Sequence, residues 1–132
     1  MTANDGAERD TPATTLPESW DITTSIGATA LSVAALRASE TAQDDPLVRD
    51  EFAAVLVAAV NEPGWQAMAQ REPPWIAADD DVGRRTARTG RGYIATRTVF
   101  FDEFCVAATM SGIRQVVILA AGLDARAYRL AC

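Results

Sequence analysis

The sequence has 132 residues, of which 48% are hydrophobic, enough for one domain of ordinary size with a sizeable core. Its 12 basic and 18 acidic residues give a net charge of −6, and this balance opposes nonspecific binding to nucleic acid. The chain has no histidine, which excludes Ser-His-Asp and Cys-His catalysis. Its two cysteines are isolated, so we expect neither a metal site nor a disulfide framework.

The sequence predicts neither membrane association nor export. No apolar run approaches the roughly 20 residues that a helix needs to cross a bilayer, and the N-terminal residues are polar and acidic. We therefore predict a cytoplasmic protein that does not bind membranes. Residues 1–18 lack aliphatic periodicity and contain Pro12 and Pro17, which predicts a disordered N-terminal arm.

The middle of the chain is predicted to be mainly helical. Apolar residues recur at helical spacing after Ser25, a suitable N-cap, and this predicts a helix that ends near Glu40. A second helix is predicted from Asp45, as its cap, to Val60, because apolar residues there recur at i, i+3, i+4 and i+7. Residues 65–83 contain two adjacent prolines and an acidic triplet, which predict an irregular, mobile segment with a solvated loop.

A third helix is predicted over residues 84–110. Its predicted inward-facing stripe consists of Tyr93, Arg97, Phe101, Phe104 and Ala108. A guanidinium buried without a partner would cost several kcal/mol, so Arg97 requires a partner. That partner is either the carboxylate of a bound ligand or an internal carboxylate, unless the side chain reaches the surface. The internal carboxylates within reach are Asp102, Glu103 and Asp124.

The segment from Gln115 to Leu130 carries the strongest indication of a ligand site. Its apolar run from Val116 to Leu119 is typical of a buried strand in a parallel sheet. The small residues that follow, Ala120-Ala121-Gly122-Leu123-Asp124, let backbone amides approach a ligand at the start of a helix. The turn supplies one of the three glycines of the dinucleotide fingerprint, so an ordinary strand-to-helix connection explains it equally well.

Four blocks of the sequence, in this order and spacing, carry a family resemblance. They are WDITTSIGATALSVAALRASE, DPLVRDEFA, TRTVFFDEF and GIRQVVILAAGLDARAYRL. Together they resemble the N-terminal part of mycobacterial S-adenosylmethionine-dependent methyltransferases, which are relatives of leucine carboxyl methyltransferases and polyketide O-methyltransferases. The resemblance extends from about Trp20 to Leu130.

The resemblance implies an α/β, class I Rossmann-like methyltransferase fold, of which this chain contains a mostly α portion. Residues 19–112 would form a helical cap with its lead-in helices, and residues 113–132 the start of a truncated cofactor-binding domain with the first strand and its glycine turn. The implied cofactor is S-adenosyl-L-methionine. Arg97 would bind the methionyl carboxylate of this cofactor. The turn would contact the cofactor through Ala120, Ala121, Gly122 and Asp124.

The implied reaction is O-methylation of a small acid or hydroxylated metabolite, and no catalytic residue is assigned. Ala120 departs from the family pattern, because it stands where a glycine is common, and the acidic residue that binds ribose in such enzymes is absent from this sequence. Two alternatives therefore stay open. The chain is a truncated, catalytically inactive remnant, or it is a small helical module that self-associates through an exposed apolar surface.

Overall fold

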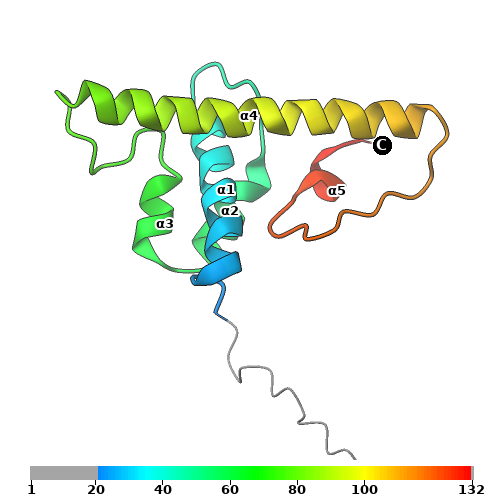
Figure 1. Ribbon diagram of the computed structural model, residues 1–132, viewed down its shortest axis with the longest axis horizontal. Coiled ribbons are helices and arrows are strands. Elements are labelled where there is room, and N and C mark those ends of the chain that lie inside the picture. The colour runs from blue at the N-terminus through cyan, green and yellow to red at the C-terminus, as the bar shows by residue number, and fades with distance from the viewer. Residues whose placement is uncertain (1–20, 132) are drawn as a thin grey trace, which may run out of the picture.

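The computed structural model describes residues 21–131, so the predicted arm at 1–18 lies outside the described residues. The described residues contain no strand. Their helices are α1 (Ser25–Thr41), α2 (Glu51–Ala59), α3 (Pro63–Met68), α4 (Asp81–Met110) and α5 (Arg126–Arg129). Figure 1 shows α1, α2 and α3 grouped beneath one half of the long α4, while the chain after α4 turns back so that α5 lies beneath its other half.

Helix α1 forms the centre of the hydrophobic core. Its residues Leu31, Ala34 and Ala35 are fully buried, and Val57 of α2 packs in the same core. Alanine side chains let helices approach closely, which explains how α1 contacts α2, α3 and α4 at once. The core is completed by partly buried side chains from α3 and from the segment before α5, namely Trp65, Met68, Ala69 and Leu123.

Helix α2 begins later than the sequence predicts. Its N-cap is Asp50, whose carboxylate accepts a hydrogen bond from the backbone N–H of Ala53 at 3.1 Å. The residues from Asp45 onward form a loop instead, because the buried Glu40 carboxylate accepts the backbone N–H of Leu47 at 2.7 Å. The prediction that Asp45 caps this helix is therefore wrong, whereas the predicted end of the helix near Val60 is confirmed.

Part of the segment predicted to be irregular forms α3. Pro63 occupies the first turn, and the Glu62 carboxylate accepts the backbone N–H of Trp65 at 3.1 Å. Proline at the first helical position and an acidic N-cap both favour helix initiation. The remaining residues, up to the start of α4, are irregular as predicted.

Helix α4 is longer than predicted, and its buried stripe differs from the predicted one. Asp80 is its N-cap and accepts the backbone N–H of Gly83 at 2.8 Å. The buried positions are Ile94, Ala95, Thr98 and Asp102. The predicted inward-facing stripe is therefore wrong, because it lies about one residue before the buried positions along the chain. Two of its members, Tyr93 and Phe104, are 67% and 65% exposed. Asp102 can be buried because two arginines of the C-terminal segment neutralise it.

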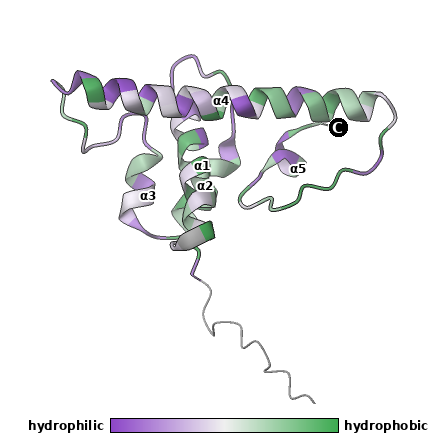
Figure 2. Cartoon of the chain, viewed as in Figure 1, coloured by the Kyte–Doolittle hydropathy of each residue, from purple (hydrophilic) through white to green (hydrophobic). Residues whose placement is uncertain are grey.

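The predicted strand from Val116 to Leu119 is not formed. These residues run as an irregular segment between α4 and α5, and Leu119 is 86% exposed. A strand needs a neighbour to pair its backbone N–H and C=O groups, and the described residues supply no second strand. Figure 2 shows this segment and the C-terminal half of α4 as mostly hydrophobic, in contrast to the N-terminal half of α4.

No helix among the described residues is both long and apolar enough to cross a membrane.

Candidate functional site

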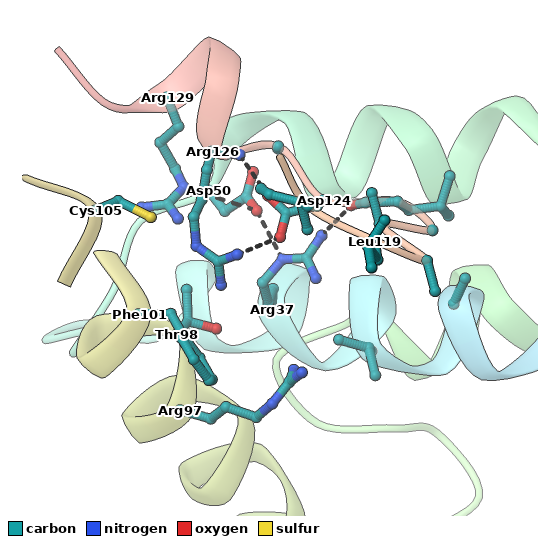
Figure 3. A pocket seen from close by; sticks show the side chains of 18 of the residues that line it. Arg37, Asp50, Arg97, Thr98, Phe101, Cys105, Leu119, Asp124, Arg126 and Arg129 are labelled. Atoms are coloured by element: carbon teal, nitrogen blue, oxygen red, sulfur yellow. Dashed lines mark hydrogen bonds and ion pairs between the residues drawn. The ribbon is translucent and has the colours of Figure 1, made fainter. Parts of the chain in front are cut away.

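A cavity of about 690 Å³ lies between α1, α4 and the segment that precedes α5 (Figure 3). All five residues that the sequence nominates for a cofactor site line it, namely Arg97, Ala120, Ala121, Gly122 and Asp124. Apolar side chains of α1 and α4 form much of its wall, including Ile26, Val33, Phe101 and Phe104. The volume is within the range of about 300–1,000 Å³ that is usual for small-molecule sites.

The Gly122 turn lies directly against α1. Gly122 has φ +57°, and a Cβ atom added to it would lie 3.0 Å from the Cβ of Ala30. Both the left-handed backbone and the close approach favour glycine here. Ala120 also adopts a positive φ, +51°, which costs about 1 kcal/mol or more for a residue with a Cβ atom. The alanine that departs from the family pattern therefore occupies a position where glycine is conformationally favoured.

Asp124 lines the cavity, but both of its carboxylate oxygens bind Arg126. Oδ1 accepts the backbone N–H of Arg126 at 2.8 Å, and Oδ2 is 2.5 Å from its Nη1. Asp124 therefore fixes the start of α5 and holds a guanidinium beside the cavity. The backbone N–H of Asp124 donates to the carbonyl of Ala121 at 3.1 Å, which closes the turn.

Arg97 carries an exposed guanidinium at the cavity. Figure 3 shows its side chain extending from α4 toward α1, and its Cζ lies 5.6 Å from the centroid of the Phe101 ring. In residues 21–131 Arg97 forms no ion pair: Asp102 and Asp124 bind other arginines, and Glu103 has no ion-pair partner. None of the three predicted internal partners is therefore used. The guanidinium is open to an anionic ligand.

A network of buried charges supports the wall of the cavity beside α5. Asp102 accepts hydrogen bonds from Arg126 Nε at 3.0 Å and from Arg129 Nη1 and Nη2 at 2.6 and 2.8 Å. Burial disfavours the charged form of Arg129, but the hydrogen bonds to Asp102 and the nearby carboxylates outweigh it and raise the pKa of the guanidinium. Arg129 Nε is buried without a hydrogen bond and lies 3.9 Å from Asp50 Oδ2.

The same network reaches α1 through Arg37. Its Nε donates to Asp50 Oδ2 at 2.8 Å, and its Nη2 donates to the carbonyl oxygen of Leu123 at 2.6 Å. Sequence reasoning missed Arg37, Arg126 and Arg129. The i, i+3 spacing of the last two indicates that they share one side of a helical turn, but their carboxylate partner is 24 to 27 residues away.

The comparison with protein families shows which family the chain belongs to. Residues 30–132 match the family model described as leucine carboxyl methyltransferase. The chain belongs to the leucine carboxyl methyltransferase family. The resemblance inferred from the sequence is thereby confirmed. The similar proteins described below are named as S-adenosyl-L-methionine-dependent methyltransferases.

Similar members of the family come from mycobacteria. A "Putative S-adenosyl-L-methionine-dependent methyltransferase" of Mycolicibacterium smegmatis is 56% identical over 92% of this chain and 38% of its own length. Proteins of the same name from Mycobacterium avium and Mycobacterium tuberculosis are 56% and 55% identical over 88% of this chain, and over 36% and 37% of their own lengths. The chain thus spans less than two fifths of these relatives. No solved structure matches.

The residues that line the cavity indicate which kind of ligand it could bind. Residues 21–131 contain no group of three or more Cys, Asp or Glu side chains that could hold a metal ion. The cavity instead combines one open guanidinium, apolar and aromatic side chains, and a turn whose backbone is exposed at Gly122. This combination suits a ligand with a carboxylate at one end and an apolar or aromatic body.

Proposed function

We propose that this chain supplies the methionine side of an S-adenosylmethionine site in an O-methyltransferase that acts on a small acid or hydroxylated metabolite. In this proposal residues 19–112 are the helical cap, and residues 113–132 begin a Rossmann-like cofactor-binding domain. The observation that carries the proposal is the open guanidinium of Arg97 at the cavity that the Gly122 turn also lines.

The residues of the cavity fit the amino-acid end of S-adenosylmethionine. A guanidinium presents two parallel N–H donors that match a carboxylate, and such charge-assisted bonds are among the strongest in proteins. Arg97 would hold the methionyl carboxylate, and the backbone of the turn at Gly122 would form the adjoining wall of the site. Asp124 would act by keeping the turn and Arg126 in place.

When bound, S-adenosylmethionine would supply a methyl group, carried on a sulfonium sulfur, for transfer to an acceptor oxygen. Arg97 contributes by fixing the position of the donor, since in-line displacement depends on alignment. The apolar side chains of Ile26, Val33 and Phe104 line the space beside it. A carboxylate acceptor loses no proton in this reaction and so needs no general base.

The test compares two ligands and two variants by isothermal titration calorimetry. Arg97→Ala should weaken S-adenosylmethionine binding by about tenfold or more, since a hydrogen bond to a charged group contributes about 1.5–3 kcal/mol. Methylthioadenosine has the same adenosine but a neutral thioether in place of the sulfonium, and it lacks the carboxylate, so Arg97→Ala should not change its affinity. Arg88→Ala is the control, because Arg88 is an exposed arginine of the same helix that does not line this cavity. Equal losses of affinity for the two ligands in Arg97→Ala would contradict the proposal that Arg97 binds the methionyl carboxylate.

A second proposal, that the chain is a noncatalytic helical module, is favoured by one observation. Large apolar side chains are exposed on the C-terminal half of α4 and on the segment after it, including Phe100, Phe104, Met110, Val117 and Leu119. Exposed apolar groups of this size favour association. Sedimentation velocity over a range of protein concentrations distinguishes the two proposals. Self-association in excess S-adenosylmethionine, together with no detectable binding of the cofactor, would support the module.

A further inference from the structure

We infer that Arg37 is a positioning residue that fixes the backbone of the Gly122 turn relative to α1 and so sets how deeply a ligand enters the cavity. The inference rests on the proposed S-adenosylmethionine site, whose floor this turn would form. Arg37 lies on the cavity wall, but its donors are directed at protein groups.

The contacts of Arg37 join two distant parts of the chain. Its side chain is among the most buried charged groups, with 7% of the residue exposed. One nitrogen donates to Asp50 Oδ2 at 2.8 Å, and another donates to the Leu123 carbonyl at 2.6 Å, across 86 residues of sequence. Figure 3 shows both bonds beside the cavity. A carbonyl held in this way fixes the orientation of the peptide between Leu123 and Asp124.

The turn is therefore held at Leu123 from two sides. The Leu123 side chain packs against the core cluster of Ala34, Ala35 and Val57, while its carbonyl binds Arg37. Gly122 and Asp124, the neighbours of Leu123, both line the cavity. Movement of the turn away from α1 would break the Arg37 bond and withdraw the leucine from the core at the same time.

Asp50 gives Arg37 a fixed position. Asp50 is 1% exposed, caps α2 through its Oδ1, and donates its own backbone N–H to Thr41 Oγ1 at 2.9 Å. Its Oδ2 is the atom that accepts from Arg37. The guanidinium is thus aligned by a carboxylate that cannot rotate without losing the cap of a helix, and this alignment aims Nη2 at the turn.

Lysine cannot replace arginine in this arrangement. A guanidinium places two separate nitrogens at fixed positions, whereas an ammonium is one nitrogen on a flexible stem. Arg37→Lys keeps the charge beside Asp50 but cannot reach both partners with the same geometry. The substitution should therefore release the turn while leaving the charge balance of the network unchanged.

The experiment compares Arg37→Lys with Arg91→Lys in the full chain. Arg91 forms an ion pair with the buried Glu40 at 3.2 Å and does not line the cavity, so it controls for loss of a comparable pair. We expect Arg37→Lys to weaken S-adenosylmethionine binding about tenfold, equivalent to 1.4 kcal/mol. We also expect faster hydrogen exchange at the amides of residues 121–125, while Arg91→Lys changes neither quantity. Unchanged binding and exchange in Arg37→Lys would overturn the inference.

Two measurements separate this inference from the proposed function and from a folding defect. Hydrogen exchange of the turn tests the Arg37 contact even if the wild-type chain binds no S-adenosylmethionine, in which case only the proposed function fails. If Arg37→Lys does not fold, the Arg37 Nε–H signal of the wild type serves instead. Its chemical shift should change on saturation with S-adenosylmethionine, whereas that of Arg91 should not, and an unchanged Arg37 signal would overturn the inference.

Discussion

Replacing Gly122 with alanine introduces two separate penalties that the structure allows to be calculated. The backbone has φ +57°, and an alanine there costs about 1–2 kcal/mol relative to glycine. The new Cβ would lie 3.0 Å from the Cβ of Ala30, well inside the optimum carbon–carbon separation of about 3.5–4.0 Å. Relief of this contact requires the turn to move away from α1, and overpacking of this kind typically costs about 1–3 kcal/mol.

We therefore expect Gly122→Ala to lower the free energy of unfolding by about 2–5 kcal/mol. At about 4 °C per kcal/mol for a domain of this size, the melting temperature should fall by about 8–20 °C. Circular dichroism at 222 nm during thermal unfolding measures this directly. The two penalties can be separated by adding Ala30→Gly, which removes the contact but leaves the backbone strain.

Ala30→Gly alone should destabilise α1 by about 1 kcal/mol, because glycine is a poor helix former. Combined with Gly122→Ala, it should cost less than the sum of the two single changes, since the close contact exists only when both positions carry a Cβ atom. Strict additivity, or a Gly122→Ala melting temperature within about 2 °C of the wild type, would refute the close packing of the turn against α1.

Three further substitutions test other parts of the site. Ala120→Gly should stabilise the chain by about 0.5–1 kcal/mol, because relief of the strain at φ +51° exceeds the entropy lost by glycine, and a lower melting temperature would contradict the backbone conformation. Asp102→Asn should destabilise the chain by about 2–4 kcal/mol in urea titrations, because it removes the hydrogen-bonded carboxylate of Arg129 and leaves Arg126 with Asp124 alone. The exposed Glu103→Gln should have little effect, and equal effects of the two substitutions would argue against the network. Arg71→Ala should raise the pKa of Asp44 toward its ordinary value, because the hydrogen bond from Arg71 and then its charge lower that pKa. The stabilisation from this pair is present above the ordinary pKa of an aspartate and is lost as the pH falls through the lowered pKa of Asp44. An Asp44 pKa that stays low in NMR titration would contradict that contact.

The positions of the helices could be predicted from the sequence better than their buried faces. The first helix follows from its apolar periodicity, and α4 follows from a long run over residues 84–110 that only Gly90 and Gly92 interrupt. The start of α2 could not be placed, because Asp45 and Asp50 are both suitable caps. The choice depends on the Thr41 and Arg37 contacts of Asp50, which are not visible in local sequence.

The buried face of α4 shows a different limit of sequence reasoning. The sequence predicts that aromatic residues face inward with Arg97 among them, whereas the buried side of the helix carries Thr98 and Asp102. A buried carboxylate contradicts binary patterning unless its partners are known. Those partners are arginines of the C-terminal segment, and only the folded chain brings them to Asp102.

The candidate site could be predicted residue by residue but not as a cavity. The family resemblance nominated Arg97 and the turn around Gly122, and these residues line one cavity. The strand predicted before the turn is not formed, because Val116 and its neighbours have no strand to pair with among the described residues. The role of Arg37 could not be predicted, because its partner on the turn is a backbone carbonyl, which no sequence pattern reveals.

Titration of the purified chain with S-adenosylmethionine, with Arg97→Ala measured in parallel, tests the central proposal most directly. We expect saturable binding at one site in the wild type and an affinity lower by about tenfold or more in the variant. The absence of binding to the wild type, or equal affinities for the two proteins, would contradict the assignment of this cavity to the cofactor.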